Sequence, residues 1–236
     1  MGNFDIKIEK FLKAFIDNGG YHNVLTGLKN TMEIAIIGLL IGIAIGTLIA
    51  SIRVLPKYRT LPRVLDKICS FYVAIFRGTP MVVQLLVFYY VLMPLMGFKI
   101  DGLNVAITVF GLNSGAYVSE IMRGGILSVD PGQLEGGRSV GMSYATTMFK
   151  IVIPQAIKNI LPTLGNEFIT LVKETSIVSF VGAMDLYKVF NDIGTNNYEF
   201  MVPSLVMAGI YIIIVCLITL GIKFMDRRVR KSDRRS

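Results

Sequence analysis

The sequence predicts an all-α, polytopic membrane protein with five transmembrane helices. Three observations support this fold class. The chain has 236 residues, of which 53% are hydrophobic and only 17% are charged, whereas about a quarter of a typical soluble domain is charged. Its mean hydropathy is +0.61. Apolar runs of about 20 residues, the length that a helix needs to cross a bilayer, recur along the chain.

Residues 1–22 predict a short amphipathic segment that precedes the first span. Apolar residues recur there at helical spacing, namely Phe4, Ile8, Phe11, Leu12, Phe15 and Ile16. Such a helix lies on the membrane surface. The stretch contains neither a continuous apolar core nor a cleavage site, so we expect no removable signal peptide.

Residues 23–227 predict one transmembrane domain, in which the spans cover about residues 31–52, 64–98, 103–122, 160–181 and 202–222. The second span is long for a bilayer, and we expect it to tilt or to kink near Gly78 and Pro80. A long loop, 124–158, separates the third and fourth spans. A basic tail, 228–236, follows the fifth.

The basic residues of the loops predict the orientation of the chain. They gather in alternate loops: Arg53, Lys57, Arg59, Arg63 and Lys67 after the first span, Arg123, Arg138, Lys150 and Lys158 after the third, and seven in the last fourteen positions. The opposite loops hold only Lys99 and Lys188. The positive-inside rule therefore places the N-terminus outside and the C-terminus in the cytoplasm. Four lysines before the first span weaken this assignment slightly, namely Lys7, Lys10, Lys13 and Lys29. Because the tail follows an apolar run, we expect it to face lipid headgroups and not nucleic acid.

The residue types present exclude several kinds of chemistry. His22 is the single histidine, and the two cysteines, Cys69 and Cys216, form no metal-binding pattern. The sequence has no phosphate-binding loop and no His-Glu-x-x-His. We therefore expect a chain that is not an enzyme and binds no cofactor. It also shows no internal repeat, so a second copy or a related chain is needed to enclose a symmetric pathway.

The loop 124–158 has helical periodicity of its own. Met142, Ala145, Met148, Phe149 and Val152 recur at three-to-four spacing, and Pro154 is expected to stop the helix. This pattern predicts a short amphipathic helix. Its apolar face either fits a groove on a cytoplasmic partner or lies on lipid.

This loop resembles that of the membrane subunits of ABC importers, which carry E-A-A, three residues, G, nine residues and I-x-L-P. The present chain has Glu135-Gly136-Gly137, then Gly141, and then Ile151-Val152-Ile153-Pro154 at the same spacing. Three further segments resemble the polar amino-acid branch of this family: FRGTP at 76–80 with Gln84-Leu85, GAYVSEIMRGGI at 115–126, and LVKETS at 171–176. The resemblance covers about residues 25–225.

The resemblance implies a type I ABC importer fold in the bacterial cytoplasmic membrane. It implies that ATP and Mg are bound by two separate cytoplasmic subunits, which receive the helix from Ser143 to Pro154. Residues implied to couple to these subunits are Glu135, Gly141, Tyr144, Met148, Phe149 and Pro154. Further implied partners are a second permease, identical or related, and an extracytoplasmic amino-acid-binding protein.

Charged side chains within spans are costly and are candidates for function. Arg77, Lys173 and Glu174 fall near the middle of the membrane by helical rise. An amino acid needs a cation for its carboxylate and an anion or oxygens for its ammonium group. We therefore take these three residues as candidate substrate contacts, together with the polar Asn113, Tyr117 and Ser176. Alternatively, Arg77 pairs with Glu174 only to hold the bundle together.

Two other functions remain open at this point. One is an ABC permease for another small polar solute. The other is a secondary transporter subunit driven by an ion gradient, although such proteins are usually longer and contain a repeat. Whether uptake follows ATP or an ion gradient distinguishes the two classes.

Overall fold

The computed structural model describes residues 3–56, 58 and 60–231, and no strand occurs among them. The α-helices are α1 Asn3–Leu12, α2 Gly20–Val54, α3 Thr60–Gly78, α4 Met81–Val87, α5 Met93–Leu95, α6 Gly102–Leu127, α7 Pro131–Ser139, α8 Tyr144–Thr147, α9 Ile153–Glu174, α10 Leu186–Asn197 and α11 Met201–Lys231. Three π-helical stretches, η1 Lys13–Asp17, η2 Phe88–Leu92 and η3 Met148–Val152, and one 3₁₀ stretch, η4 Thr175–Val181, join them. The predicted all-α class is confirmed. Lys57, Arg59 and residues 232–236 of the predicted tail lie outside the described residues.

Within the described part of the chain, three helices are long and apolar enough to cross a membrane: α2, α6 and residues Met201–Arg228 of α11. The helical stretches Thr60–Gly78 and Met81–Leu95 make one further candidate span when they are counted together. α9 is more polar, since it carries Lys158, Glu167, Lys173 and Glu174. The count of five spans and the orientation of the termini therefore stay predictions.

The second predicted span is interrupted where a kink is expected. α3 ends at Gly78 and α4 begins at Met81, with Pro80 in an extended conformation between them. Proline has no N–H to donate to a helix, and it disfavours helical geometry in the residue before it. The sequence Gly78-Thr79-Pro80 thus ends one helix and starts the next.

The chain divides into two compact units, each of which is described here by itself. Unit 1 comprises Met1–Gly38, Pro80–Phe110 and Thr170–Leu217, and unit 2 comprises Leu39–Thr79, Gly111–Ile169 and Ile218–Ser236. The long helices α2, α6, α9 and α11 contribute residues to both.

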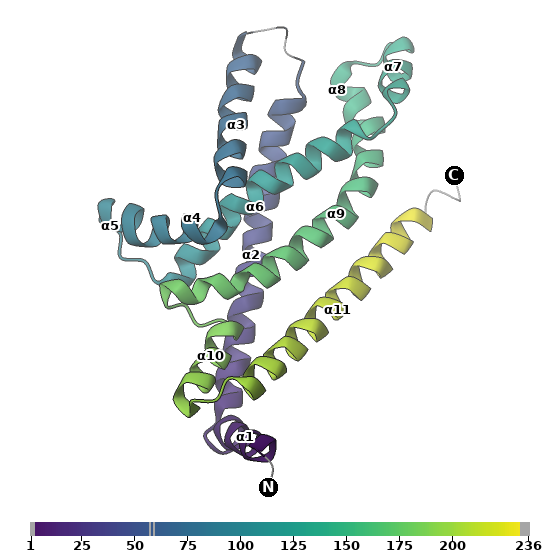
Figure 1. Ribbon diagram of the computed structural model, residues 1–236. Coiled ribbons are helices and arrows are strands. Elements are labelled where there is room, and N and C mark those ends of the chain that lie inside the picture. The colour runs from purple at the N-terminus through teal and green to yellow at the C-terminus, as the bar shows by residue number, and fades with distance from the viewer. Residues whose placement is uncertain (1–2, 57, 59, 232–236) are drawn as a thin grey trace. The chain divides into compact units, whose positions relative to one another are not determined.

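The core of unit 1 forms where α1, the start of α2, α10 and the start of α11 meet (Figure 1). Its buried residues are Phe11, Val24, Leu186, Val189, Phe190, Ile193 and Val202. The Lys7 ammonium group lies 3.2 Å from a carboxylate oxygen of Glu199 and adds an ion pair. The predicted amphipathic helix therefore exists, but one of its sides packs on α10 and α11, while Phe4, Leu12 and Ile16 are exposed.

Unit 2 is built on the C-terminal half of α2, with α3 beside it (Figure 1). Ile49 of α2, Cys69 and Val73 of α3 and Ala116 of α6 form a shared core. α6 approaches α2 closely, because a Cβ atom on Gly46 would lie only 2.7 Å from Val118 Cγ1. Small residues allow such close helix packing in membranes.

The prediction that Pro154 stops the loop helix is wrong. Helical structure runs from Tyr144 through η3 into α9, and Pro154 is the second residue of α9. η3 explains the tolerance of proline: its wider i→i+5 turns displace the preceding carbonyl groups with which the proline ring would otherwise clash.

Candidate functional site

Three of the six predicted substrate-contact residues meet in unit 2, where α3 ends against α6. The guanidinium carbon of Arg77 lies 5.2 Å from the centre of the Tyr117 ring. One turn along α6, the buried Asn113 donates a hydrogen bond from Nδ2 to the Phe76 carbonyl oxygen at 3.2 Å. Among the described residues no carboxylate pairs with Arg77. Its guanidinium is thus held by an aromatic face and retains donors for an anion from outside the chain.

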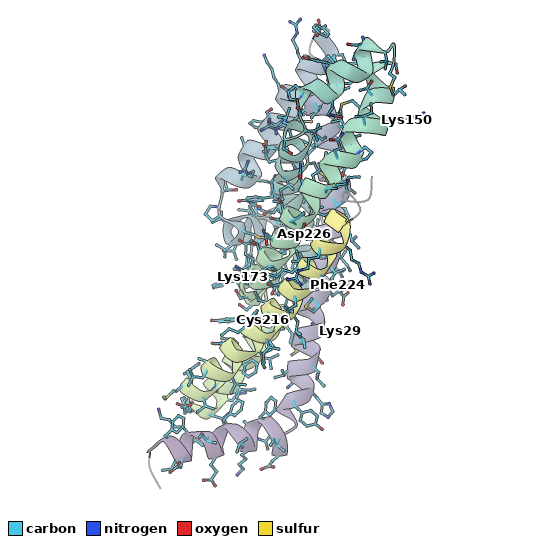
Figure 2. The ribbon with its side chains drawn as sticks, turned by 90° about the vertical axis from the view of Figure 1, so that its right-hand side faces the viewer. Lys29, Lys150, Lys173, Cys216, Phe224 and Asp226 are labelled. Carbon is cyan, nitrogen blue, oxygen red and sulfur yellow. The ribbon has the colours of Figure 1, made fainter. Side chains whose placement is uncertain are left out.

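Two others lie in unit 1 on a pocket of about 510 Å³ between α9, η4 and α11. Lys173 and Ser176 line it together with Tyr187, Tyr211 and Cys216, and Figure 2 labels Lys173 on α9 and Cys216 on α11. The remaining lining residues are apolar. Lys173 is exposed on this largely apolar pocket, so its ammonium group is accessible to an anionic group.

Glu174 is half-buried at the last position of α9, after which the helix tightens into η4. Ser176 donates its hydroxyl to the Lys173 carbonyl oxygen at 3.2 Å, so this hydroxyl is engaged by its own helix. Arg77 belongs to unit 2 and Glu174 to unit 1. The alternative in which these two residues pair stays a prediction.

The sequence reasoning missed Glu167, which also falls within the predicted fourth span. Ser114 of α6 donates its hydroxyl to Glu167 Oε1 at 3.2 Å in unit 2. A scan of every charged residue in that span would have found it. Tyr211 is a second omission, because a single tyrosine in an uncharged span gives no signal until the pocket that it lines is known.

The loop between α6 and α9 folds as two short helices joined by a turn, and we call residues 131–154 the coupling segment. Asp130 accepts the Gly132 N–H at 2.8 Å and starts α7, while Ser143 accepts the Thr146 N–H at 3.1 Å and starts α8. Both are standard helix caps. Gly141 turns the chain between them with a φ of +86°, which is costly for other residues.

The coupling segment buries one face and exposes the other. Phe149 is 71% exposed, and Glu135 and Pro154 are also exposed. Met148, in contrast, is buried with Val129, Val152, Ala156 and Ile160. Met148 therefore packs in the permease's own core, and its contact with another subunit stays a prediction.

Tyr144 faces inward as well. Its hydroxyl donates to the carbonyl oxygen of Val54, the last residue of α2, at 3.4 Å. Partial burial raises the pKa of this hydroxyl above its ordinary value. Tyr144 thus joins the coupling segment to α2.

The two glycines of Glu135-Gly136-Gly137 have different surroundings. A Cβ atom on Gly137 would lie 2.4 Å from Thr147 Cγ2, whereas a Cβ atom on Gly136 would have no neighbour within 4 Å. Gly137 therefore allows α7 and α8 to pack closely. At Gly136 the space would accept an alanine.

A family described as "binding-protein-dependent transport system inner membrane component" matches residues 38–231. The chain belongs to this family. The resemblance to ABC importer subunits is thereby confirmed: the chain is a multi-pass permease subunit of the inner membrane, and not an enzyme.

Relatives match this permease over most of its length. The arginine transport system permease protein ArtQ of Bacillus subtilis is 36% identical over 210 residues, which are 89% of this chain and 94% of that protein. The L-cystine transport system permease protein TcyB of Bacillus subtilis is 36% identical over 86% of this chain and 85% of its own length. The glutamine transport system permease protein GlnP of Escherichia coli is 30% identical over 88% of this chain and 93% of its own.

Solved structures agree on the fold of this permease. A chain of an amino acid ABC transporter crystallised with histidines has a TM-score of 0.81 at 36% identity, covering 88% of this chain and 94% of that one. A chain of the MetNI methionine ABC transporter has a TM-score of 0.75 at 20% identity, covering 87% and 95%, and supports the fold alone. The type I ABC importer permease fold is confirmed.

Proposed function

We propose that this permease imports a polar amino acid, in a complex with two cytoplasmic ATP-binding subunits and a second permease, identical or related. The proposal rests on relatives named for arginine, cystine and glutamine transport. Each of them matches more than four fifths of this chain. An extracytoplasmic amino-acid-binding protein would deliver the substrate, as the name of the family suggests.

Each unit contributes its own polar candidates for contact with the substrate. Arg77, whose guanidinium stacks on Tyr117 and pairs with no carboxylate among the described residues, is suited to a substrate carboxylate. Lys173 and Ser176 on the pocket of unit 1 are suited to a second anionic or polar group. Glu174 offers a carboxylate for an ammonium group, and Asn113 positions the end of α3 through Phe76.

The coupling segment would meet the ATP-binding subunits. Its exposed face carries Phe149, Glu135 and Pro154, and the turn at Gly141 lies at its tip. When the ATP-binding subunits close on ATP and Mg, the coupling segments would move with them and open the pathway alternately to the two sides. Five spans with the N-terminus outside would place this segment in the cytoplasm.

Reconstitution in proteoliposomes tests the proposal. The permease is purified with its ATP-binding subunits, the cognate binding protein is added outside, and uptake of labelled arginine, cystine, glutamine and histidine is measured with and without ATP inside. We expect saturable uptake of at least one of them that requires ATP. Uptake that follows an ion gradient without ATP, or ATP-dependent uptake of a solute that is not an amino acid, would overturn it.

A further inference from the structure

Arg53, in the last turn of α2, joins three helices of unit 2. Its Nη1 donates a hydrogen bond to Glu120 Oε1 on α6, and its Nε lies 3.8 Å from Asp66 Oδ1 on α3. Arg123, one turn further along α6, donates from Nη2 to Glu120 Oε2 at 2.8 Å. We call these four residues the Arg53 cluster.

The Arg53 cluster is shielded from solvent. The side chains of Arg53, Asp66 and Glu120 are only 16%, 18% and 20% exposed. Glu120 uses both carboxylate oxygens, one for each arginine. Charge-assisted hydrogen bonds in such surroundings are strong, and removal of the Glu120 charge would take away the carboxylate that both arginines share. The cluster therefore resists separation of the ends of α2, α3 and α6.

The coupling segment is attached to this cluster at two points. Tyr144 donates to the carbonyl oxygen of Val54, which directly follows Arg53. The start of the segment follows from α6, because only residues 128–130 separate α6 from α7. The coupling segment is thus connected to the last turn of α2 through Tyr144 and to the end of α6 through residues 128–130.

The coupling segment contacts α2 at Val54. Besides accepting the Tyr144 hydrogen bond, Val54 packs against the buried cluster that contains Met148. A cavity of about 180 Å³ lies beside this contact, and Ser51, Leu55, Ala145 and Phe149 are among the residues that line it. A displacement of the coupling segment would reach α2 through Val54.

We propose that the Arg53 cluster transmits the movement of the coupling segment to α2, α3 and α6 as one body, with Glu120 as its central positioning residue. This inference rests on the proposed function, because it concerns the efficiency with which ATP hydrolysis drives transport. If these ion pairs only stabilised the fold, their loss would lower transport and ATP hydrolysis in the same proportion.

The test compares Glu120→Gln with the wild-type complex in proteoliposomes. Glutamine keeps the size of the side chain and one acceptor but removes the charge. We expect the ratio of amino acid transported to ATP hydrolysed to fall about ten-fold, within the range of coupling between two sites, while ATP hydrolysis changes less than about two-fold. Transport and hydrolysis that fall in the same proportion would overturn the inference. Lys67→Gln, an exposed cation next to Asp66 on α3, is the matched control and should leave the ratio unchanged.

Tyr144→Phe tests the same connection without touching a charge. It removes only the hydroxyl that reaches Val54 and should also lower the ratio, whereas Tyr58→Phe, at a tyrosine that is 87% exposed, should not. Combining Tyr144→Phe with Glu120→Gln should lower the ratio no further than Glu120→Gln alone, because both act on one connection. If Glu120→Gln does not assemble, an unchanged ratio in Tyr144→Phe overturns the inference by itself. A wild-type complex without ATP-dependent uptake would instead refute the proposed function.

Discussion

The guanidinium of Arg77 rests on the ring of Tyr117, with 5.2 Å between the guanidinium carbon and the ring centre. Such a contact stabilises a cation by about 0.5–2 kcal/mol, and by more when water is excluded. It fixes the direction of a charge without neutralising it. A residue held in this way can pair with a substrate carboxylate and release it again.

The first prediction concerns this aromatic support. Tyr117→Phe keeps the ring and should transport with a KM within about two-fold of the wild type, whereas Tyr117→Leu removes the ring and should raise KM about five- to ten-fold, as a loss of about 1 kcal/mol implies. Initial rates of uptake in proteoliposomes measure both. Equal KM values for the two variants would show that Tyr117 acts through its hydroxyl or merely fills space.

Removal of the charge of Glu174 is the second prediction. Glu174→Gln should abolish the stimulation of ATP hydrolysis by the amino acid and its binding protein, because the anion that would face the substrate ammonium group is lost. The complex should still assemble, since the variant keeps the shape of the side chain. ATPase assays and size-exclusion chromatography measure the two properties. Stimulation that persists at the wild-type level contradicts a role of Glu174 in sensing substrate.

A third prediction follows from the turn at Gly141. With a φ of +86°, this position strains any other residue by about 1–2 kcal/mol, and Gly141→Asp also adds a charge at the tip of the coupling segment. The permease dimer should form, but the ATP-binding subunits should no longer co-purify with it. Pull-down through a tag on the permease measures this. Gly136→Ala serves as the control, and normal co-purification of Gly141→Asp would refute the prediction.

The two adjacent glycines of α7 provide the fourth prediction. Gly136→Ala meets no neighbour and should raise the free energy of unfolding by up to about 1 kcal/mol, because alanine favours the helix. Gly137→Ala should lower it by about 1–3 kcal/mol, because its Cβ meets Thr147 Cγ2. Adding Thr147→Ser, which removes that methyl group, should restore only part of the loss, because Thr147 Oγ1 would still lie 2.9 Å from the new Cβ. Thermal unfolding in detergent measures the series, and equal effects of the two alanines would contradict it.

Asp185 provides the fifth prediction, on the dependence of stability on pH. It is fully buried at the start of α10, in the predicted extracytoplasmic loop, and burial raises its pKa to about 6, although the backbone N–H groups of Lys188 and Tyr187 act in the opposite direction. Between about pH 4 and 6 the unfolded chain ionises this carboxyl group and the folded chain does not. The protonated Asp185 carboxyl group therefore contributes fully to the free energy of unfolding below about pH 4. This contribution, up to about 3 kcal/mol, is lost as the pH rises to 6.

Asp185→Asn isolates this contribution. Asparagine keeps an acceptor for the N-terminus of α10 but does not titrate. The difference in melting temperature between pH 4.5 and pH 7 should be smaller in the variant than in the wild type. The same change with pH in both proteins would show that Asp185 does not titrate in this range.

The sequence alone was sufficient for the fold class, because hydropathy and motif spacing are local properties. It also located the interruption at Pro80, since proline acts on its immediate neighbours. Other features depend on tertiary contacts and were missed. The burial of Met148 follows from packing against Val129 and Ala156. Helical periodicity identifies an apolar face but does not show whether that face packs against the same chain or against another protein. Glu167 was overlooked although its charge was visible in the sequence.

The π-helical stretch Met148–Val152 has a consequence for the rotational phase of the coupling segment. A π-helix holds more residues in each turn than an α-helix, so η3 sets the angle at which Phe149 points away while Ala156 and Ile160 stay buried on α9. Deletion of one residue within 148–152 would restore α-helical geometry and rotate everything before it by about 100° around the axis. The side chains of α8 would then turn by somewhat more than a quarter of a full rotation relative to α9, and Phe149 would no longer point in its present direction. The extra residue in the turn of η3 thus determines which side chains of the coupling segment are exposed.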